Sequence, residues 1–447
     1  MDDHIIKKYD IRGIVGKDLQ ISDVYEIGRK FGQTVDSVCV GYDSRIDSPN
    51  IEKELIRSLI LSGANIIRIG LCSSPMLYTA TQVMEIDLGI MITASHNPRE
   101  YNGFKFFSSK RVYSNQEIKE IISNPIKNNT KIGKLINVNI YSEYICILKT
   151  ALKNNFTQKL KIAWDFSNSP ASGIARYLGK ILPNHVHIVI NSSIDGAFPL
   201  HDPDPIEEEN LAQLIDIVKR NECDLGVALD GDGDRVRLID GKGNIVSNDH
   251  LFMIFAREIL EEYPGSKVIA NIKISMKVYD FIRRLGGKVI TCATGHSLIK
   301  KKMIEEKAKF AGELSGHFFF FELGFDDGLY SAIKTINILL KKKQSLFRMI
   351  EDLPKIYITR EMKVIVKDEK KFKIIESIKK TLEQQNILFS EMDGIKVTNG
   401  DNKSWWLLRA SNTQNCITAR CEGETLKDFE MIKKVLFNYI DSIHLVE

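Results

Sequence analysis

The sequence predicts an α/β protein with three related βαβαβ units, whose sheets are parallel or mixed, and a separate C-terminal α+β domain. Three observations predict this fold class. Short, continuously apolar strands alternate with amphipathic helices, as in parallel sheets with both faces buried. This order occurs three times and stops near residue 356. The 447 residues also suffice for about three domains, give or take one, at roughly 150 residues each.

The first unit sets the pattern that the others repeat. We expect its strands at residues 38–42, 66–71 and 88–93. Ser48-Pro49 and Ser74-Pro75 separate these strands, and each pair is typical of the N-cap and first residue of a helix. Two helices between three apolar strands complete a βαβαβ unit.

The second and third units follow the same order, and the tail departs from it. For the second unit we expect strands at 161–165, 186–190 and 224–229, with helices near 171–181 and 211–220. For the third we expect a helix near 250–262, strands at 267–271, 288–291 and 309–311, and helices near 276–285 and 298–307. The tail carries a Lys/Glu-rich helix near 369–386 and a strand at 405–409. These patterns predict domains at 1–140, 141–244, 245–355 and 356–447.

Composition and charge exclude several classes of function. With 43% hydrophobic and 27% charged residues, the chain is neither disordered, collagenous nor a coiled coil. Since 62 Lys and Arg offset 58 Asp and Glu, bulk charge gives no support for nucleic-acid binding. No apolar run approaches the roughly 18 residues of a membrane span, and the acidic start is unlike a secretory signal. We therefore expect a cytoplasmic protein without nucleic-acid or membrane partners. The seven cysteines are scattered and lack C-x-x-C spacing, which favours neither disulfides nor a zinc site.

A polar loop follows the third strand of each unit. The three loops are residues 94–98, 230–235 and 312–317. Ligands of parallel sheets bind beyond the carboxyl ends of the strands, so these loops are the candidate functional segments.

The second loop has the composition of a metal site. Asp230, Asp232 and Asp234 alternate with glycines, so a tight turn can direct all three carboxylates to one point. Their repulsion favours a cation between them, and hard oxygen ligands favour Mg²⁺ over Ca²⁺ or Mn²⁺. The adjacent Arg235 suits an anionic partner. The alternative is an exposed acidic turn between two strands.

In the first loop, Ser95 follows an apolar strand and precedes a turn at Asn97-Pro98, which exposes its hydroxyl on a rigid scaffold. No G-x-S-x-G elbow surrounds it, which disfavours acyl transfer and leaves phosphoryl transfer or a plain turn serine. Neighbouring residues of extended chain point apart, so His96 need not be the base of Ser95.

Two further loops suit a phosphorylated sugar. The third unit ends in the alternating side chains of Glu313, Ser315 and His317, which can bind the hydroxyls of a polyol. The tail offers a bidentate cation and short donors for a phosphate dianion, namely Arg409, Ser411, Asn412 and Thr413. The alternatives are a surface turn with a structural histidine and a polar turn after a strand.

Taken together, five segments in this order resemble the α-D-phosphohexomutase family, in its phosphomannomutase/phosphoglucomutase branch. The segments are residues 9–13, 93–98 with 101–105, 230–235, 312–317 and 409–413. The resemblance covers essentially the whole chain. It implies four domains around a central cleft and an isomerase that transfers a phosphoryl group within its substrate.

The resemblance also implies roles for individual residues. Ser95 would be the phosphoserine and, with Asp230, Asp232 and Asp234, would hold Mg²⁺. The implied active-site positions are Tyr9, Arg12, His96, Lys105, Arg235, Lys273 and His296. Glu313, Ser315 and His317 match the sugar-binding loop. The implied phosphate-binding residues are Arg409, Ser411, Asn412 and Thr413, which Arg420 joins.

The implied reaction interconverts hexose 1-phosphate and hexose 6-phosphate of mannose or glucose through a 1,6-bisphosphate, with glucose 1,6-bisphosphate as activator. Lys105 and His317 are the candidate acid and base, and we expect a lowered pKa for Lys105 in a cationic cleft. Leu314 is closer to the methionine of the mannose/glucose branch than to the glutamine of the glucosamine branch. Gln414-Asn415 replaces a frequent proline of the phosphate loop, which predicts altered loop stiffness.

Other functions remain open at this stage. A phosphoglucosamine mutase, a metal-dependent sugar-phosphate phosphatase and a sugar-phosphate sensor without activity are the alternatives. We expect small-molecule sugar phosphates as partners, and a monomer.

Overall fold

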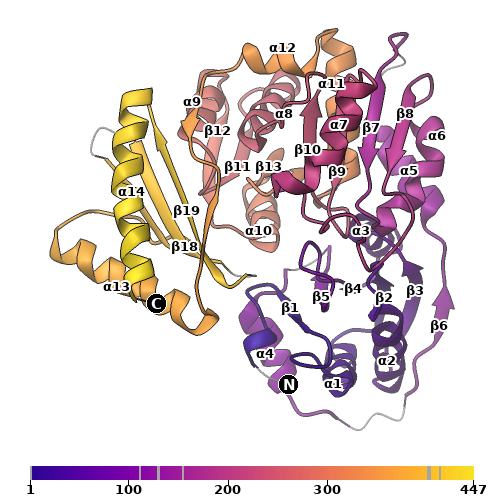
Figure 1. Cartoon of the computed structure of the whole chain (residues 1–447). Coiled ribbons are helices and arrows are strands. Elements are labelled where there is room, and N and C mark those ends of the chain that lie inside the picture. The colour runs from indigo at the N-terminus through magenta and orange to yellow at the C-terminus, as the bar shows by residue number, and fades with distance from the viewer. Residues whose placement is uncertain are drawn as a thin grey trace.

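The computed structural model describes residues 3–109, 112–127, 131–153, 156–399, 404–411 and 414–446. Within these residues the strands form four sheets, one in each of four successive domains (Figure 1). Figure 1 shows the fourth domain, in yellow, beside the third. This confirms the predicted fold class. The exact domain boundaries stay a prediction, because the sheets do not fix where each linker begins.

The first domain is a mixed sheet in the order β1-β5-β4-β2-β3-β6. Its strands are β1 (Asp10–Ile14), β2 (Ser37–Tyr42), β3 (Asn65–Leu71), β4 (Leu88–Ile92), β5 (Tyr101–Phe107) and β6 (Leu135–Asn137). Its helices are α1 (Ile21–Gly32), α2 (Ser48–Leu61), α3 (Ser74–Val83) and α4 (Asn115–Ser123), after a short 3₁₀ turn at Asp3–Ile5. The three predicted strands are parallel, whereas β5 runs antiparallel to β4 and β1 antiparallel to β5.

Both Ser-Pro pairs start helices, but one residue earlier than predicted. Ser48 and Ser74 are the first helical residues, and Asp47 and Ser73 take the N-cap positions. The two predicted caps use their hydroxyls elsewhere. The hydroxyl of Ser48 donates to Oδ1 of Asp43, and that of Ser74 donates to Oδ2 of Asp232.

The second domain has the sheet order β10-β9-β7-β8. Its elements are α5 (Tyr141–Thr150), β7 (Lys161–Asp165), α6 (Leu178–Ile181), β8 (Val186–Ile190), a 3₁₀ turn (Glu208–Leu211), α7 (Ala212–Arg220), β9 (Leu225–Leu229) and β10 (Val236–Asp240). The helix predicted near 171–181 is wrong in type. Residues Pro170–Tyr177 form a 3₁₀ helix and only the last turn is α-helical, because Ser172 and Gly173 are weak helix formers.

The third domain has the sheet order β12-β11-β13-β14. Its elements are α8 (Asn248–Glu262), β11 (Lys267–Asn271), α9 (Met276–Arg284), β12 (Lys288–Cys292), α10 (His296–Glu306), β13 (Phe310–Gly312), β14 (Phe318–Phe320), α11 (Gly328–Lys342) and α12 (Leu346–Glu351). In both middle domains the last strand is antiparallel, so the sheets are mixed. Each loop between the last two strands therefore lies at the carboxyl edge of the parallel part.

The fourth domain is an antiparallel sheet covered by two helices. Its strands are β15 (Tyr357–Ile358), β16 (Met362–Ile365), β17 (Ile395–Thr398), β18 (Ser404–Ala410) and β19 (Cys416–Gly423). Its helices are α13 (Asp368–Gln384) and α14 (Leu426–Val446). Its core is its own, built around side chains such as Trp406 and Leu436, whereas one continuous core joins the facing sides of the first three domains.

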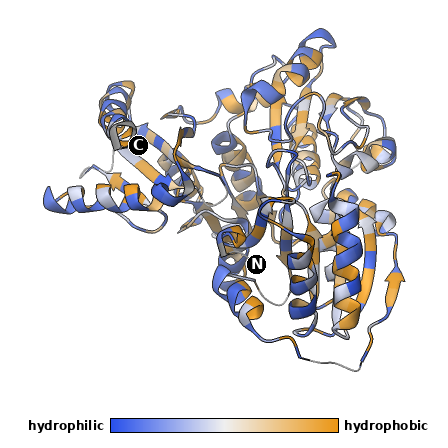
Figure 2. Cartoon of the chain, turned by 60° about the horizontal axis from the view of Figure 1, so that its bottom comes forward, coloured by the Kyte–Doolittle hydropathy of each residue, from blue (hydrophilic) through white to orange (hydrophobic). Residues whose placement is uncertain are grey.

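The surface pattern agrees with a protein folded around these cores. The helices alternate between hydrophilic and hydrophobic residues along their length, as expected where one face packs on a sheet (Figure 2). Among the described residues, no helix combines the length and the apolar character that crossing a membrane requires.

Candidate active site

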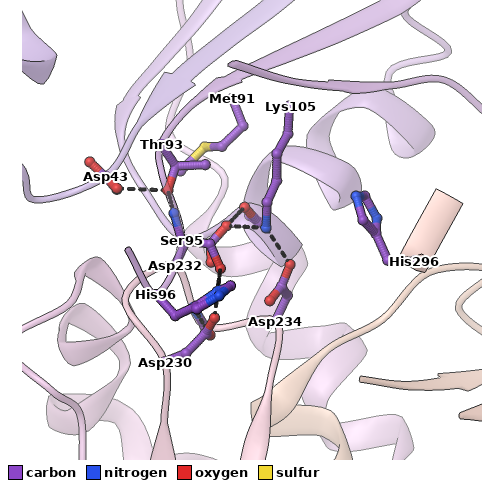
Figure 3. Close-up of polar contacts among 12 residues, drawn as sticks. Asp43, Met91, Thr93, Ser95, His96, Lys105, Asp230, Asp232, Asp234 and His296 are labelled. Atoms are coloured by element: carbon purple, nitrogen blue, oxygen red, sulfur yellow. Dashed lines mark hydrogen bonds and ion pairs between the residues drawn. The ribbon is translucent and has the colours of Figure 1, made fainter. Parts of the chain in front are cut away.

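The loops that follow β4 and β9 meet at the boundary between the first two domains (Figure 3). Ser95 lies three residues after β4, and Asp230 directly follows β9. The Ser95 hydroxyl donates to Oδ2 of Asp230 over 2.9 Å, and both residues are 0% exposed. A serine of one domain and a carboxylate of the next thus share one buried site.

The three aspartates of the second loop converge as predicted. Carboxylate oxygens of Asp230, Asp232 and Asp234 lie within 4.8 Å of one another, and all three residues are buried. Nζ of Lys105 lies 2.6 Å from Oδ2 of Asp232 and 2.6 Å from Oδ2 of Asp234, and Nε of Arg235 lies 3.7 Å from Oδ2 of Asp230. Oδ1 of Asp232 and Oδ1 of Asp234 are each buried without a hydrogen-bond partner among the described residues. Unpaired, hard oxygen ligands around one point fit a divalent cation.

The protonation of the cluster follows from burial and neighbouring charge. Burial raises the pKa of Asp230 well above its usual range, and the negative charges of Asp234 and Asp232 raise it further. Burial also acts to raise the pKa of Asp234, but the nearby Lys105 and His317 outweigh it and lower that pKa. The raised pKa of Asp230 thus reflects the repulsion among the three carboxylates, which a bound cation would relieve.

The expected lowering of the Lys105 pKa is wrong. Burial does act to lower the pKa, but the two carboxylates at 2.6 Å, Asp232 and Asp234, outweigh it and raise the pKa well above its ordinary value. The prediction placed Lys105 among cations, whereas the fold places it among anions. Its ammonium compensates the aspartates as a bound cation would.

His96 lies closer to Ser95 than extended backbone allows. Ser95 has φ 53°, in the left-handed region, and this turn brings Nδ1 of His96 to 3.3 Å from the serine Oγ. Burial lowers the pKa of His96 well below its usual value, and the cations Arg235 and Arg12 lower it further. A neutral imidazole beside the hydroxyl is the result.

Arg12, on β1, braces the same loop from the other side. Its guanidinium pairs with Asp10 at 2.8 Å and donates to the carbonyl oxygen of Ala94 and to Oδ1 of Asn97. This arginine is only 5% exposed. It therefore reaches the serine loop with its charge already partly compensated.

The third loop places His317 between the carboxyl group of Asp326 and the guanidinium of Arg235. Nδ1 of His317 lies 2.6 Å from Oδ2 of Asp326, and Nε of Arg235 donates to Nε2 of His317 over 2.9 Å. Burial, with Arg235 contributing, lowers the pKa of His317 to about 4. Burial, with Asp234 contributing, raises the pKa of Asp326 to about 7. His317 is therefore neutral near pH 7.

The other polar residues of this region are held by short local contacts. Glu313 accepts from the amide of Gly295 and from the hydroxyl of Ser315, each over 2.8 Å. The rings of His296 and His317 are stacked with centroids 6.0 Å apart, and burial lowers the pKa of His296 to about 4. A carboxylate, a hydroxyl and two neutral imidazoles form one wall for an uncharged polar group.

The basic residues on the opposite side are paired with carboxylates. Nε of Arg409 donates to Oδ2 of Asp393 over 3.0 Å, and Nζ of Lys273 lies 3.0 Å from Glu361. Ser411 accepts from the Gln414 amide over 3.1 Å. Asn412 and Thr413, which were predicted to bind phosphate, lie outside the described residues.

One cavity lies among these groups and is lined by residues of all four domains. Most of the predicted site residues line it: Tyr9, Arg12, His96, Lys105, Arg235, Lys273, His296, Glu313, Ser315, His317, Arg409 and Ser411. Ser95, Asp230, Asp232 and Asp234 are fully buried and are not among its lining residues, and neither is Arg420. Its guanidinium donates to Asp249 and to the carbonyl oxygen of Thr359, so it serves the contact between the third and fourth domains.

The structure also adds residues that the sequence analysis did not single out. Asp204, Glu361 and Lys363 line the cavity, and Asp326 contacts His317. Asp204 belongs to an Asp-Pro-Asp-Pro run that signals an ordered turn, whereas Lys363 lies in a strand whose pattern carries no such signal.

A buried serine against three carboxylates that fit a divalent cation, across a cavity from basic residues, defines a phosphoryl-transfer enzyme that acts on an anionic substrate. Comparison with known proteins makes this more specific. Models of the phosphoglucomutase/phosphomannomutase α/β/α domains I, II and III match residues 3–132, 140–243 and 247–357, and the model of the C-terminal domain matches residues 361–438.

Whole proteins match over the same extent. A phosphomannomutase/phosphoglucomutase of Pseudomonas syringae is 38% identical over 97% of this chain and 94% of its own length. A phosphomannomutase of Methanocaldococcus jannaschii is 36% identical over 97% of both chains. The crystal structure of a phosphoglucomutase/phosphomannomutase family protein from Burkholderia thailandensis superposes with a TM-score of 0.87 at 30% identity, covering 99% of this chain and 98% of that one. The chain therefore belongs to the phosphoglucomutase/phosphomannomutase family and is a phosphohexomutase by class.

Proposed function

We propose that this protein interconverts the 1-phosphates and 6-phosphates of mannose and glucose, with Ser95 as the carrier of the phosphoryl group. The observation that carries the proposal is the 2.9 Å hydrogen bond between the Ser95 hydroxyl and Asp230 within the carboxylate cluster. A phosphoryl group on this oxygen would lie beside the three aspartates, where a cation is needed to neutralise both. The full-length similarity to phosphomannomutases and phosphoglucomutases supports the choice of sugar.

Asp230, Asp232 and Asp234, with an oxygen from Ser95, would hold Mg²⁺. When bound, this ion supplies positive charge that offsets the carboxylates and the phosphoryl oxygens. The unpaired, buried Oδ1 atoms of Asp232 and Asp234 support this assignment. Lys105 then gives up part of its contact with the carboxylates and becomes available to the transferred group.

The proposed reaction is a pair of phosphoryl transfers. In the first, the bond between phosphorus and the Ser95 Oγ breaks while a bond forms from phosphorus to the free hydroxyl of the hexose phosphate. The hydroxyl proton passes to a base, for which neutral His317 is our candidate once its Nε2, which accepts from Arg235 in this structure, is released to the substrate. Asp326, 2.6 Å from Nδ1, can orient the imidazole. Arg12 and Lys105 stabilise the negative charge of the transferred group.

The second transfer reverses these steps on the other phosphate. The 1,6-bisphosphate reorients, its other phosphoryl group returns to Ser95, and the base returns its proton to the sugar oxygen that is set free. In each orientation of the sugar, one phosphate is not being transferred. That phosphate would be bound by Arg409, Ser411, Asn412 and Thr413. Added glucose 1,6-bisphosphate would maintain the phosphorylated enzyme.

The test is an assay with glucose 1-phosphate, Mg²⁺ and a trace of glucose 1,6-bisphosphate, with parallel assays on mannose and glucosamine phosphates. We expect glucose 6-phosphate and mannose 6-phosphate without release of inorganic phosphate. Intact mass should show one phosphoryl group, which is absent from Ser95→Ala, whereas Ser123→Ala, an exposed serine of the same domain, should behave as wild type. Phosphate release would favour a phosphatase, and turnover of glucosamine phosphate alone would favour a phosphoglucosamine mutase.

We further propose that the enzyme acts as a monomer in the cytoplasm, on small-molecule sugar phosphates only. Light scattering at the assay concentration tests the first of these statements. A mass of twice the 50.8 kDa of one chain would contradict it.

A further inference from the structure

A buried ion pair lies directly behind the Ser95 loop, outside the cavity. Asp43 and Arg45 belong to the segment between β2 and α2, and each is only 1% exposed. Nε of Arg45 lies 3.1 Å from Oδ2 of Asp43. Neither residue is among those that line the cavity. Ser95 does not line it either, so what distinguishes the pair is its set of contacts, which hold the backbone of the serine loop.

The guanidinium of Arg45 collects the carbonyl oxygens of the serine loop. It donates to the carbonyl of Ser95 over 2.7 Å, and also to the carbonyls of Asn97 at 2.6 Å, Pro98 at 2.7 Å and Tyr101 at 2.9 Å. These four acceptors span the whole turn that carries the serine. One side chain thus fixes the path of the loop.

Asp43 fixes the backbone amide of Ser95 through the Thr93 hydroxyl. The amide of Ser95 donates to Oγ1 of Thr93 over 2.7 Å, and the Thr93 hydroxyl donates to Oδ2 of Asp43 over 2.7 Å (Figure 3). The Asp43–Arg45 pair therefore holds both backbone polar groups of Ser95. The N–H is linked to Asp43 through the Thr93 hydroxyl, and the C=O accepts directly from Arg45.

The backbone conformation of Ser95 explains why its loop needs these contacts. Ser95 has φ 53°, a left-handed conformation that is unfavourable for a residue other than glycine and persists only where the surroundings impose it. This backbone turn directs the hydroxyl to Asp230 over 2.9 Å. If the loop relaxed toward ordinary φ values, the hydroxyl would leave the carboxylate cluster.

Stability alone is a weak reason to retain such a pair. Buried ion pairs add little net free energy compared with well-packed apolar residues, because desolvation of both charges offsets their attraction. Here burial acts to lower the pKa of Arg45 and to raise that of Asp43, which reflects this cost. The planar guanidinium is instead the only side-chain group with five donors in a fixed fork, which four carbonyl acceptors require.

We infer that the Asp43–Arg45 pair is the positioning element that fixes the Ser95 hydroxyl in line for phosphoryl transfer. The inference rests on the proposed role of Ser95 as phosphoryl carrier. Because the pair touches the serine loop and not the cavity, it controls the rate of transfer and leaves the binding of sugar phosphate unchanged.

The test compares Arg45→Lys and Thr93→Val with the wild-type enzyme. Lysine keeps the charge of Arg45 but offers three donors on one atom, and valine keeps the shape of Thr93 but not its hydroxyl. We expect kcat to fall about a hundredfold in Arg45→Lys, as for a misplaced reacting group, and about tenfold in Thr93→Val. KM should stay within about threefold in both, and single-turnover transfer from phosphorylated Ser95 should slow by the same factors as kcat.

The matched control is Arg57→Lys, an arginine of α2 whose side chain is 67% exposed, pairs with Glu54 and lies over the ring of Tyr25. It should keep wild-type kcat, KM and melting temperature. Two results would overturn the inference: unchanged kcat in both test variants, or a loss of kcat that comes with an equal loss of substrate and Mg²⁺ affinity. If Arg45→Lys does not fold, Thr93→Val decides alone by the same readouts.

The proposed function is judged separately, on the wild-type enzyme. Absence of mutase turnover and of phosphate on wild-type Ser95 refutes the function itself. Wild-type turnover with unchanged variants refutes only the positioning role.

Discussion

The acidic loop at 230–234 and the basic residues across the cavity differ in how their charges are compensated. Of the three buried carboxylates, Asp232 and Asp234 share the ammonium of Lys105, and Asp230 lies 3.7 Å from Nε of Arg235. Across the cavity, Arg409 is paired with Asp393, which Lys8 also approaches at 3.6 Å, and Lys273 is paired with Glu361. The first region holds three carboxylates against two cations, whereas in the second each of these cations already has a carboxylate partner.

This difference indicates two modes of ligand binding. The acidic loop gains free energy when a divalent cation enters, because buried like charges are otherwise costly. The basic side must instead exchange carboxylates for phosphate oxygens, so its cations are oriented in advance but bind anions less tightly than free cations would. Under the proposed function we therefore expect strong metal binding and exchangeable phosphate binding, as a bisphosphate that reorients would require.

Removal of one carboxylate tests the first mode and should have the largest effect. In Asp232→Asn we expect turnover to fall at least about a hundredfold. Loss of even an outer partner of a metal ligand lowers metal affinity or activity about 10- to 100-fold, and Asp232 is a proposed ligand itself. The measurement is kcat as a function of Mg²⁺ concentration. Asp216→Asn, an aspartate of α7 that is 47% exposed, is the control and should keep wild-type values. Retained activity in Asp232→Asn would contradict the metal assignment.

Removal of one cation tests the second mode. In Arg409→Ala we expect KM to rise about thirtyfold, since a hydrogen bond to a charged group contributes roughly 1.5–3 kcal/mol. The change should lie chiefly in KM and little in kcat, because the phosphate bound there does not react. Steady-state kinetics beside the exposed control Lys434→Ala measure the split. An unchanged KM would refute the role of Arg409.

A buried lysine without an ion-pair partner among the described residues sharpens the comparison. Nζ of Lys300 donates to the carbonyl oxygen of Ser108 and lies 3.5 Å from the centre of the Phe107 ring, and burial lowers its pKa to about 7. In the unfolded chain its pKa is about 10.5, so between pH 7 and pH 10.5 the unfolded state binds more protons and stability rises with pH.

We expect this one lysine to contribute a rise of about 2 kcal/mol in the free energy of unfolding between pH 7 and pH 9. Lys300→Met should remove that rise, which denaturant unfolding at both pH values measures. The exposed neighbour Lys301→Met is the control and should keep the wild-type dependence. Equal pH dependence in all three proteins would count against the buried, neutral lysine.

The smallest expected effect comes from freeing a paired cation. In Asp393→Asn the Arg409 guanidinium loses its compensating charge, so inorganic phosphate should bind about threefold tighter. Calorimetric titration with phosphate in the absence of sugar measures this, with Glu391→Gln, a neighbouring acidic residue whose side chain is 57% exposed, as the control. Weaker phosphate binding would show that Asp393 mainly orients the arginine.

Much of the site could be predicted because its residues are adjacent in sequence. The loops after β4, β9 and β13 could be recognised in the sequence because polar residues follow apolar strands there. The convergence of Asp230, Asp232 and Asp234 followed from their spacing, and the structure bears it out. Contacts between distant segments gave no comparable signal, as the pairing of Lys105 with those aspartates and of Arg420 with Asp249 illustrates.

The sequence by itself determined the fold class, the order of the loops and the chemical type of each, since hydrophobic period and local turn residues are short-range properties. The tertiary structure decided which charges meet. It placed Lys105 among anions, and it set the Asp43–Arg45 pair behind Ser95 from a loop fifty residues earlier. The physical reason is that desolvation and Coulomb interactions depend on distances in space, which only the packed domains fix.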